Sequence, residues 1–166
     1  MRIGLISDTH NEAHPLGAAL ARFREAQVQT VLHAGDVTAA HTLKLLEGFD
    51  VWIARGNMDY DPKLAFAVAE LFGAERLARV HELRFNGACI AMTHGDSWQR
   101  LETLIRAPAD DGERRYVIHG HTHAPHDQMT GMTRVINPGA IGRARWRCAT
   151  CAILDLTTDE LQWIEL

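Results

Sequence analysis

Three histidines occupy alternate positions in the stretch VIHGHTHAP, residues 117–125, directly after a short apolar run. Alternation along an extended chain places His119, His121 and His123 on one side of the backbone. Neutral imidazole nitrogens are common metal ligands, so this spacing indicates a metal site at the end of a strand. The chain has ten histidines in 166 residues, a high number that such a site would partly explain.

Polar residues of the same kinds follow four other apolar runs. The five segments are SDTHN (7–11), HAGD (33–36), RGNMD (55–59), MTHGD (92–96) and HGHTH (119–123). In four of the five, the Asp, Asn or His residues stand beside a glycine, which allows close approach of backbone and ligand. Because the carboxyl ends of parallel strands meet in one crevice, we expect these side chains to converge.

The candidate ligands are Asp8, His10, Asp36, Asn57, His94, His121 and His123. Oxygen donors mixed with imidazole, without cysteine, favour Mn²⁺, Ni²⁺, Fe²⁺, Zn²⁺ or Mg²⁺ over soft metals, and Mn²⁺ is the expected ion. Seven ligands are too many for a single tetrahedral zinc ion, which takes four. The set therefore predicts two divalent metal ions that share one bridging carboxylate.

The elements that would position these residues alternate along the first half of the chain. Strands are expected at 2–7, 29–34, 51–54 and 115–119, and a hairpin joins 78–85 to 88–93 through Asn86 and Gly87. Helices are expected from Pro15, from an N-cap at Thr38, over 63–72, and from Asp96 or Ser97 to a point before Pro108. The first half thus has βαβαβ character with parallel strands, and the second half is antiparallel or mixed. No linker or repeat interrupts the chain, which predicts a single domain over 1–166.

Composition excludes several classes of function. The net charge of −4 argues against a stable complex with nucleic acid or an anionic membrane. No apolar run approaches the ~20 residues needed to span a bilayer, and the N-terminus becomes polar too early for a signal peptide. We therefore expect a cytoplasmic protein. Cys148 and Cys151 form a lone C-x-x-C and are interpreted as ordinary strand residues.

In their order along the chain, the five segments resemble the signature blocks of the calcineurin-like metallophosphoesterases, and most closely those of the short single-domain bacterial and archaeal phosphodiesterases. The resemblance extends from Ile3 to the NPGA segment at 137–140. It implies an α/β fold, specifically a four-layer α-β-β-α sandwich with two central mixed β-sheets. It also implies a small phosphodiester substrate and is compatible with a homo-oligomer.

The resemblance assigns the ligands to two ions. One ion would be held by Asp8, His10, Asp36 and His123, and the other by Asp36, Asn57, His94 and His121. Asp36 would bridge them, and Asp36, Asn57 and His94 would be the catalytic residues. The implied reaction is attack of a metal-bridging hydroxide on phosphorus. Asn11, Asn57 and Asp59 are the expected substrate contacts, while Asp59 or Asp96 would orient a ligand.

One position departs from the pattern of the larger phosphatases in this family. They carry a histidine after the Asn of the G-N-H motif, and this chain has Met58. A missing general acid typically costs about 10²–10⁴-fold on poor leaving groups. We therefore expect modest activity, highest on activated aryl phosphodiesters and weak on monoesters.

The alternative hypothesis is a non-catalytic protein-interaction scaffold on the same fold, like the vacuolar-sorting subunit of retromer. The intact set of seven ligands favours the enzyme. Metallo-β-lactamase-like hydrolases need H-x-H-x-D-H, which HGHTHA lacks, and amidohydrolase barrels need ~250 residues.

The remaining histidines receive structural roles. His119 and His33 are expected to be structural residues of the strands, whereas four others are placed on the surface or in loops: His14, His41, His81 and His126. The alternating arginines of RARWR, namely Arg143, Arg145 and Arg147, either guide an anionic substrate or form a solvated strand face.

Overall fold

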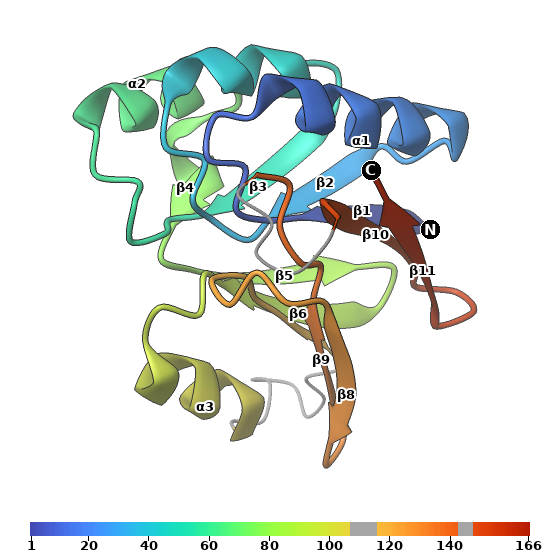
Figure 1. The fold of residues 1–166 in the computed structure, drawn as a ribbon. Coiled ribbons are helices and arrows are strands. Elements are labelled where there is room, and N and C mark those ends of the chain that lie inside the picture. Colours follow the sequence, from blue (N-terminus) through green and yellow to red (C-terminus); the bar gives the residue numbers. More distant parts are fainter. Residues whose placement is uncertain (107–115, 143–147) are drawn as a thin grey trace.

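Two mixed β-sheets pack face to face between helices, in the four-layer α/β arrangement expected from the sequence (Figure 1). The computed structural model describes residues 1–106, 116–142 and 148–166. Arg143, Arg145 and Arg147 and the predicted helix end before Pro108 lie outside these ranges. No helix within them is both long enough and apolar enough to cross a bilayer.

The first sheet contains six strands in the order β11-β10-β1-β2-β3-β4. Its members are β1 (Arg2–Ile6), β2 (Thr30–His33), β3 (Asp50–Ala54), β4 (Leu77–Ala78), β10 (Thr150–Asp155) and β11 (Glu160–Glu165). Strands β1 to β4 run parallel, as the βαβαβ pattern predicts, and β10 pairs antiparallel with β1. The carboxyl ends of β1, β2 and β3 therefore lie at one edge of this sheet.

The second sheet contains five strands in the order β5-β6-β7-β9-β8. Its members are β5 (Val80–Phe85), β6 (Ala88–Thr93), β7 (Tyr116–Ile118), β8 (His126–Thr130) and β9 (Thr133–Asn137). The predicted hairpin of β5 and β6 is present, with φ of 48° at Asn86 and 79° at Gly87. Strands β6, β7 and β9 run parallel, whereas the two outer pairs are antiparallel.

Helices cover the outer face of each sheet (Figure 1). Helix α1 (Ala13–Glu25), the 3₁₀ segments η1 (Ala40–Leu46) and η2 (Ala74–Arg76), and helix α2 (Pro62–Leu71) connect strands of the first sheet, and α3 (Trp98–Arg106) lies beside the second. The Asp61 side chain caps α2 by accepting a hydrogen bond from the Lys63 N–H at 2.9 Å. Ser97 is at the predicted cap of α3 and accepts from the Arg100 N–H at 3.3 Å.

Alternation along the strands separates the apolar side chains into three cores, one between each pair of layers. In β1, Ile3 and Leu5 join the core between the two sheets, whereas Ile6 packs with α1 residues such as Phe23. A smaller core joins Leu101 and Leu104 of α3 to the second sheet. Because these strands are buried on both faces, their side chains are apolar at consecutive positions, which explains the continuous apolar runs that precede the polar segments.

Three local predictions were wrong. Cys148 is exposed and lies before β10, which begins at Thr150, so it is not a strand residue. Thr38 is not a helix N-cap: its φ is 72°, its N–H donates to Asp59 Oδ1 at 2.8 Å, and η1 begins two residues later. His81 is not on the surface, because β5 turns it inward, where it is 5% exposed. Its Nε2–H donates to the Ile53 carbonyl at 2.9 Å, which offsets the cost of burying the ring. His14, His41 and His126 are exposed, as predicted.

His33 is buried at the end of β2 and is held as a neutral ring. The Gly35 N–H donates to its Nδ1 at 3.1 Å, so Nε2 carries the proton and donates to Thr9 Oγ1 at 2.6 Å. Burial, reinforced by the charge of His94, lowers the pKa of His33 to about 3. The predicted structural role of His33 agrees with these contacts.

This lowered pKa predicts that the metal-depleted protein loses stability as pH falls from about 6.5 towards 3. In that window unfolded His33 takes up a proton that the folded ring does not, so acid favours unfolding. Replacing His33 with Gln removes this proton, and the slope of unfolding free energy against pH becomes shallower by up to about 1.4 kcal/mol per pH unit. Urea denaturation across this pH range measures the slope.

The matched control is His41→Gln, which changes an exposed histidine and should retain the wild-type slope. Parallel pH profiles for His33→Gln and the wild type would contradict the prediction. Some slope remains in His33→Gln, because burial also lowers the pKa of His81 and of His119.

Candidate metal and phosphoester site

The seven candidate ligands follow the carboxyl ends of five strands. Asp8 and His10 follow β1, Asp36 follows β2 and Asn57 follows β3, all in the first sheet. His94 follows β6, and His121 and His123 follow β7, both in the second sheet. The site thus lies where the corresponding edges of the two sheets meet.

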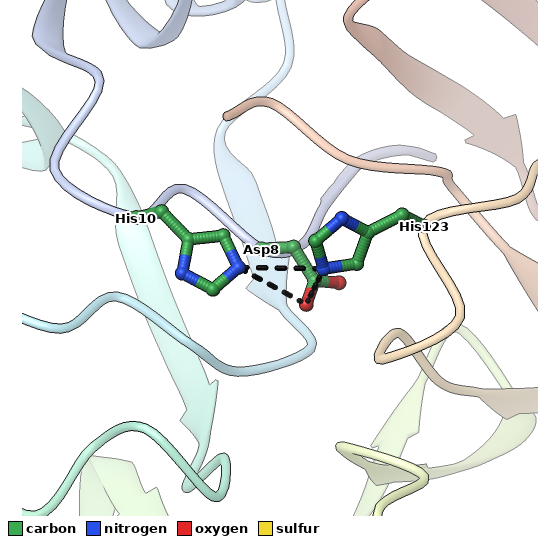
Figure 2. Close-up of side chains that lie close together, drawn as sticks. All are labelled: Asp8, His10 and His123. Atoms are coloured by element: carbon green, nitrogen blue, oxygen red, sulfur yellow. Dashed lines mark hydrogen bonds and ion pairs between the residues drawn. The ribbon is translucent and has the colours of Figure 1, made fainter. Parts of the chain in front are cut away.

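One group consists of Asp8, His10 and His123, whose side chains point toward one another in Figure 2. His123 Nε2 lies 3.1 Å from Asp8 Oδ1 and 3.3 Å from His10 Nε2. His10 Nε2 lies 3.8 Å from Asp8 Oδ1. These separations suit a carboxylate oxygen and two imidazole nitrogens arranged around one ion.

A second group consists of Asp8, Asp36 and His94. Asp36 Oδ2 lies 3.4 Å from His94 Nε2 and 3.9 Å from His10 Nε2, so it reaches a histidine of each group, and Asp8 belongs to both groups. Asn57 Oδ1 lies 3.1 Å from His94 Nε2. His121 is exposed at the margin, with its ring centroid 5.1 Å from that of His94, and is not a member of either group.

Each carboxylate has one oxygen fixed by the protein and the other directed into the site. Asp8 Oδ2 accepts hydrogen bonds from the Ser7 hydroxyl at 2.6 Å and the His121 N–H at 3.0 Å. Asp8 Oδ1 is buried and has no hydrogen-bond partner among the described residues. Asp36 Oδ1 accepts from the Met58 N–H at 2.9 Å, and Asp36 Oδ2 faces the histidines.

Asp59 positions the backbone that carries Asp36. Its two carboxylate oxygens accept the N–H groups of Asp36, Thr38 and Gly56 at 2.8–3.0 Å, and its side chain is 3% exposed. This arrangement agrees with the predicted role of Asp59 in orienting a ligand, here Asp36, whereas its substrate contact stays a prediction. Asn11 is exposed beside His10 and accessible, so its substrate contact stays a prediction.

His94 is oriented by a main-chain acceptor. Its Nδ1–H donates to the Ala34 carbonyl at 2.7 Å, which leaves Nε2 directed at Asp36 and Asn57. Burial lowers the pKa of His94, but the hydrogen bond and charge of Asp36 outweigh burial and raise it to about 9. The negative charge that favours a proton on Nε2 equally favours a divalent cation at that position.

The backbone at the ligands adopts a left-handed conformation, which residues other than glycine seldom take. Five of the seven candidates have positive φ: Asp8, His10, Asp36, His121 and His123, with values between 46° and 68°. Such residues cost roughly 1–3 kcal/mol each and cluster at functional sites. Here each left-handed residue turns the chain sharply after its strand, which lets ligands close in sequence aim at one place.

At two of the neighbouring positions glycine is required, because a ligand residue lies too close to the backbone to leave room for a Cβ atom. A Cβ atom at Gly120 would lie 2.7 Å from Asp8 Oδ2, and one at Gly56 would lie 2.5 Å from the Asp36 nitrogen. The pairing of glycine with Asp, Asn or His in the sequence therefore reflects direct packing of backbone against ligand.

Sequence reasoning missed two residues that hold the ligand loops. The two residues are Ser7 and Asn137. The Asn137 side-chain amide donates to the Gly120 carbonyl at 2.8 Å and to Thr122 Oγ1 at 2.9 Å. Its Oδ1 accepts the Gly139 N–H at 2.9 Å. The NPG sequence at 137–139 was the available signal. His119 is buried against this loop, and its Nδ1 contacts the Gly120 carbonyl at 3.1 Å, which supports a structural role.

The donor set fits divalent metal ions. A buried carboxylate oxygen without a partner is costly unless a cation or hydrogen bond satisfies it, and Asp8 Oδ1 faces two imidazole nitrogens. Oxygen and imidazole donors without thiolate suit the first-row ions and Mg²⁺. The residues could therefore hold a metal centre.

Comparison with known proteins supports this interpretation. The model of the calcineurin-like phosphoesterase superfamily domain matches residues 1–159. A phosphodiesterase of Methanocaldococcus jannaschii is 28% identical over 169 residues, which cover 100% of this chain and 99% of the relative.

Solved structures share the fold. An archaeal phosphodiesterase matches with a TM-score of 0.88 and 28% identity over 100% of both chains. A mutant Vps29 from Entamoeba histolytica has a TM-score of 0.70 at 18% identity, over 100% of this chain and 99% of its own, which shows a likeness of fold alone. This chain therefore belongs to the calcineurin-like phosphoesterase superfamily, and its enzyme class is that of a phosphoester hydrolase.

Proposed function

We propose that this protein hydrolyses small phosphodiesters at a centre of two divalent metal ions, with Mn²⁺ as the expected ion. The proposal keeps the ligand assignment made from the sequence. Asp8, His10 and His123 hold one ion, Asn57, His94 and His121 hold the other, and Asp36 bridges them. The observation that carries it is the convergence of Asp8 Oδ1 and Asp36 Oδ2 on imidazole nitrogens at 3.1–3.9 Å.

When bound, two such ions would supply a hydroxide nucleophile at neutral pH and offset charge on the phosphoryl oxygens. The chain's own residues prepare the site for this chemistry. Backbone N–H groups fix the outer oxygens of Asp8 and Asp36, so that their inner oxygens need little reorganisation. Asn57 offers its exposed amide to a phosphoryl oxygen from the margin of the same cluster.

The residue at position 58, a methionine, would not supply a proton to the leaving group. The Met58 thioether has no proton to donate, and its backbone N–H is engaged by Asp36 Oδ1. Activated aryl diesters, whose leaving groups are stable as anions, are therefore the preferred class of test substrate. The similarity to a phosphodiesterase of M. jannaschii supports diesters over monoesters as the natural class.

Metal removal tests the proposal directly. Protein depleted with a chelator should lose turnover of bis(p-nitrophenyl) phosphate and regain it with Mn²⁺, because the buried carboxylates alone repel an anionic substrate. Parallel reconstitution with Ni²⁺, Zn²⁺ and Mg²⁺ ranks the ions, and elemental analysis gives the number bound. The absence of metal-dependent turnover on any diester would favour the alternative, a non-catalytic interaction scaffold.

A pair of variants from one loop tests the ligand assignment. His121→Ala should reduce bound metal from two ions to one and lower kcat/KM by roughly 10²-fold or more, because a proposed ligand is lost. His119→Ala should retain both ions, since His119 contacts the loop and not the proposed centre. Metal content of the desalted proteins is measured beside diesterase activity. Equal metal loss in both variants would contradict the division of roles.

A further inference from the structure

A pocket of about 580 Å³ adjoins the proposed metal centre through Asn57. Its walls come from the residues after β3, the first half of α2, the link between β4 and β5, and Asp96 after β6. A volume of this size lies within the range of sites for small organic molecules and far exceeds the needs of one phosphate group. The pocket therefore has room for an organic group attached to the phosphate.

Two arginines in the pocket have no anionic partner among the described residues. Arg55 lies two positions before Asn57, and its Nε is buried without a hydrogen-bond partner in that part of the chain. Arg79 is exposed on the opposite connection. Arg55 as a whole is only partly buried, and a guanidinium matches the oxygens of a phosphate with paired hydrogen bonds. Its other N–H groups are therefore suited to hold a phosphodiester beside Asn57.

The acidic residues of the pocket are already engaged. Asp96 pairs with Arg100 at 3.3 Å, and Asp61 caps α2 through the Lys63 N–H. Asp59 is occupied by three backbone N–H groups. In the described part of the chain, only Asp96 of these three is paired with a cation, and the backbone N–H groups hold oxygens of Asp59 and Asp61 without removing their charge. The two arginines are the groups of this pocket that can attract an anion.

Two aromatic side chains line the same pocket and remain open to solvent. Tyr60 is 79% exposed and Phe66 is 76% exposed. Large aromatic rings exposed to this extent beside a pocket supply faces on which a planar ring can stack. Planar rings next to a phosphate are characteristic of nucleotides.

We propose that this pocket binds the nucleoside portion of a nucleotide-derived phosphodiester, with the base against Tyr60 and Phe66 and the phosphate at Arg55. The inference rests on the proposed phosphodiesterase function and names the substrate class of that site. The pocket sets the preference among diesters, while the candidate ligands carry the chemistry.

Two esters with one leaving group test the pocket on the Mn²⁺-reconstituted protein: p-nitrophenyl thymidine 5′-phosphate and methyl p-nitrophenyl phosphate. The wild type should favour the thymidine ester by roughly tenfold or more in kcat/KM, since only that ester has a base to stack. Tyr60→Ala and Phe66→Ala should each reduce this preference by roughly fivefold or more. Met132→Ala, an exposed side chain between β8 and β9, is the matched control and should retain it.

Arg55→Gln tests the anionic contact separately. It should raise KM for both esters by roughly tenfold, because both carry the phosphate that a charged hydrogen bond would hold. Binding of thymidine 5′-monophosphate to the Mg²⁺-reconstituted protein, followed by saturation-transfer NMR with this diamagnetic ion, gives a readout that is independent of turnover.

The outcomes separate the two proposals. Hydrolysis of both esters at equal rates, unaffected by the aromatic variants, would overturn the pocket and leave the phosphodiesterase standing. If neither ester is hydrolysed but nucleotide binding depends on Phe66, the pocket stands and the enzymatic proposal fails. If Phe66→Ala instead dissociates a dimer without changing the preference, the aromatic residues form an interface between copies, and the inference is wrong.

Discussion

The burial of two carboxylates within reach of the same histidine is the constraint on which the site depends. Asp8 is fully buried and Asp36 nearly so, with Asp8 Oδ1 at 3.8 Å and Asp36 Oδ2 at 3.9 Å from His10 Nε2. Like charges in a poorly solvated place are unfavourable without compensating positive charge. The raised pKa of His94 follows from this concentration of negative charge, and the same charge favours a bound cation.

The fold concentrates this charge without long connections. Every candidate ligand lies within a few residues of a strand end, and the left-handed residues that follow the strands redirect the chain at once. The rigid sheets thereby fix the start of each short loop and, with it, the position of the ligand that the loop carries. The neighbouring pocket draws Arg55, Gly56 and Asn57 from the same loop after β3.

The sequence was sufficient to predict the fold class and the gathering of Asp and His residues at the strand ends, because apolar strands and the polar residues that end them are local patterns. The division of seven ligands between two ions stays a prediction. The contacts that hold the ligands are not local. Asn137 acts on the loop after β7 from the end of β9, and Asp59 holds Asp36 from 23 positions away. The same limitation produced the errors at His81 and Thr38, whose environments depend on which strand or loop packs against them. Tertiary partners of this kind have no periodic signal.

The division of the candidate ligands between the two sheets has a further consequence. Asp8, His10, Asp36 and Asn57 belong to the first sheet, whereas His94, His121 and His123 belong to the second. Ions held between them would act as cross-links across the sandwich, comparable to a reversible disulfide. Because the unfolded chain cannot present these ligands together, bound metal would stabilise the native state by mass action. A melting temperature of this protein would then report the free metal concentration as well as the quality of its apolar cores.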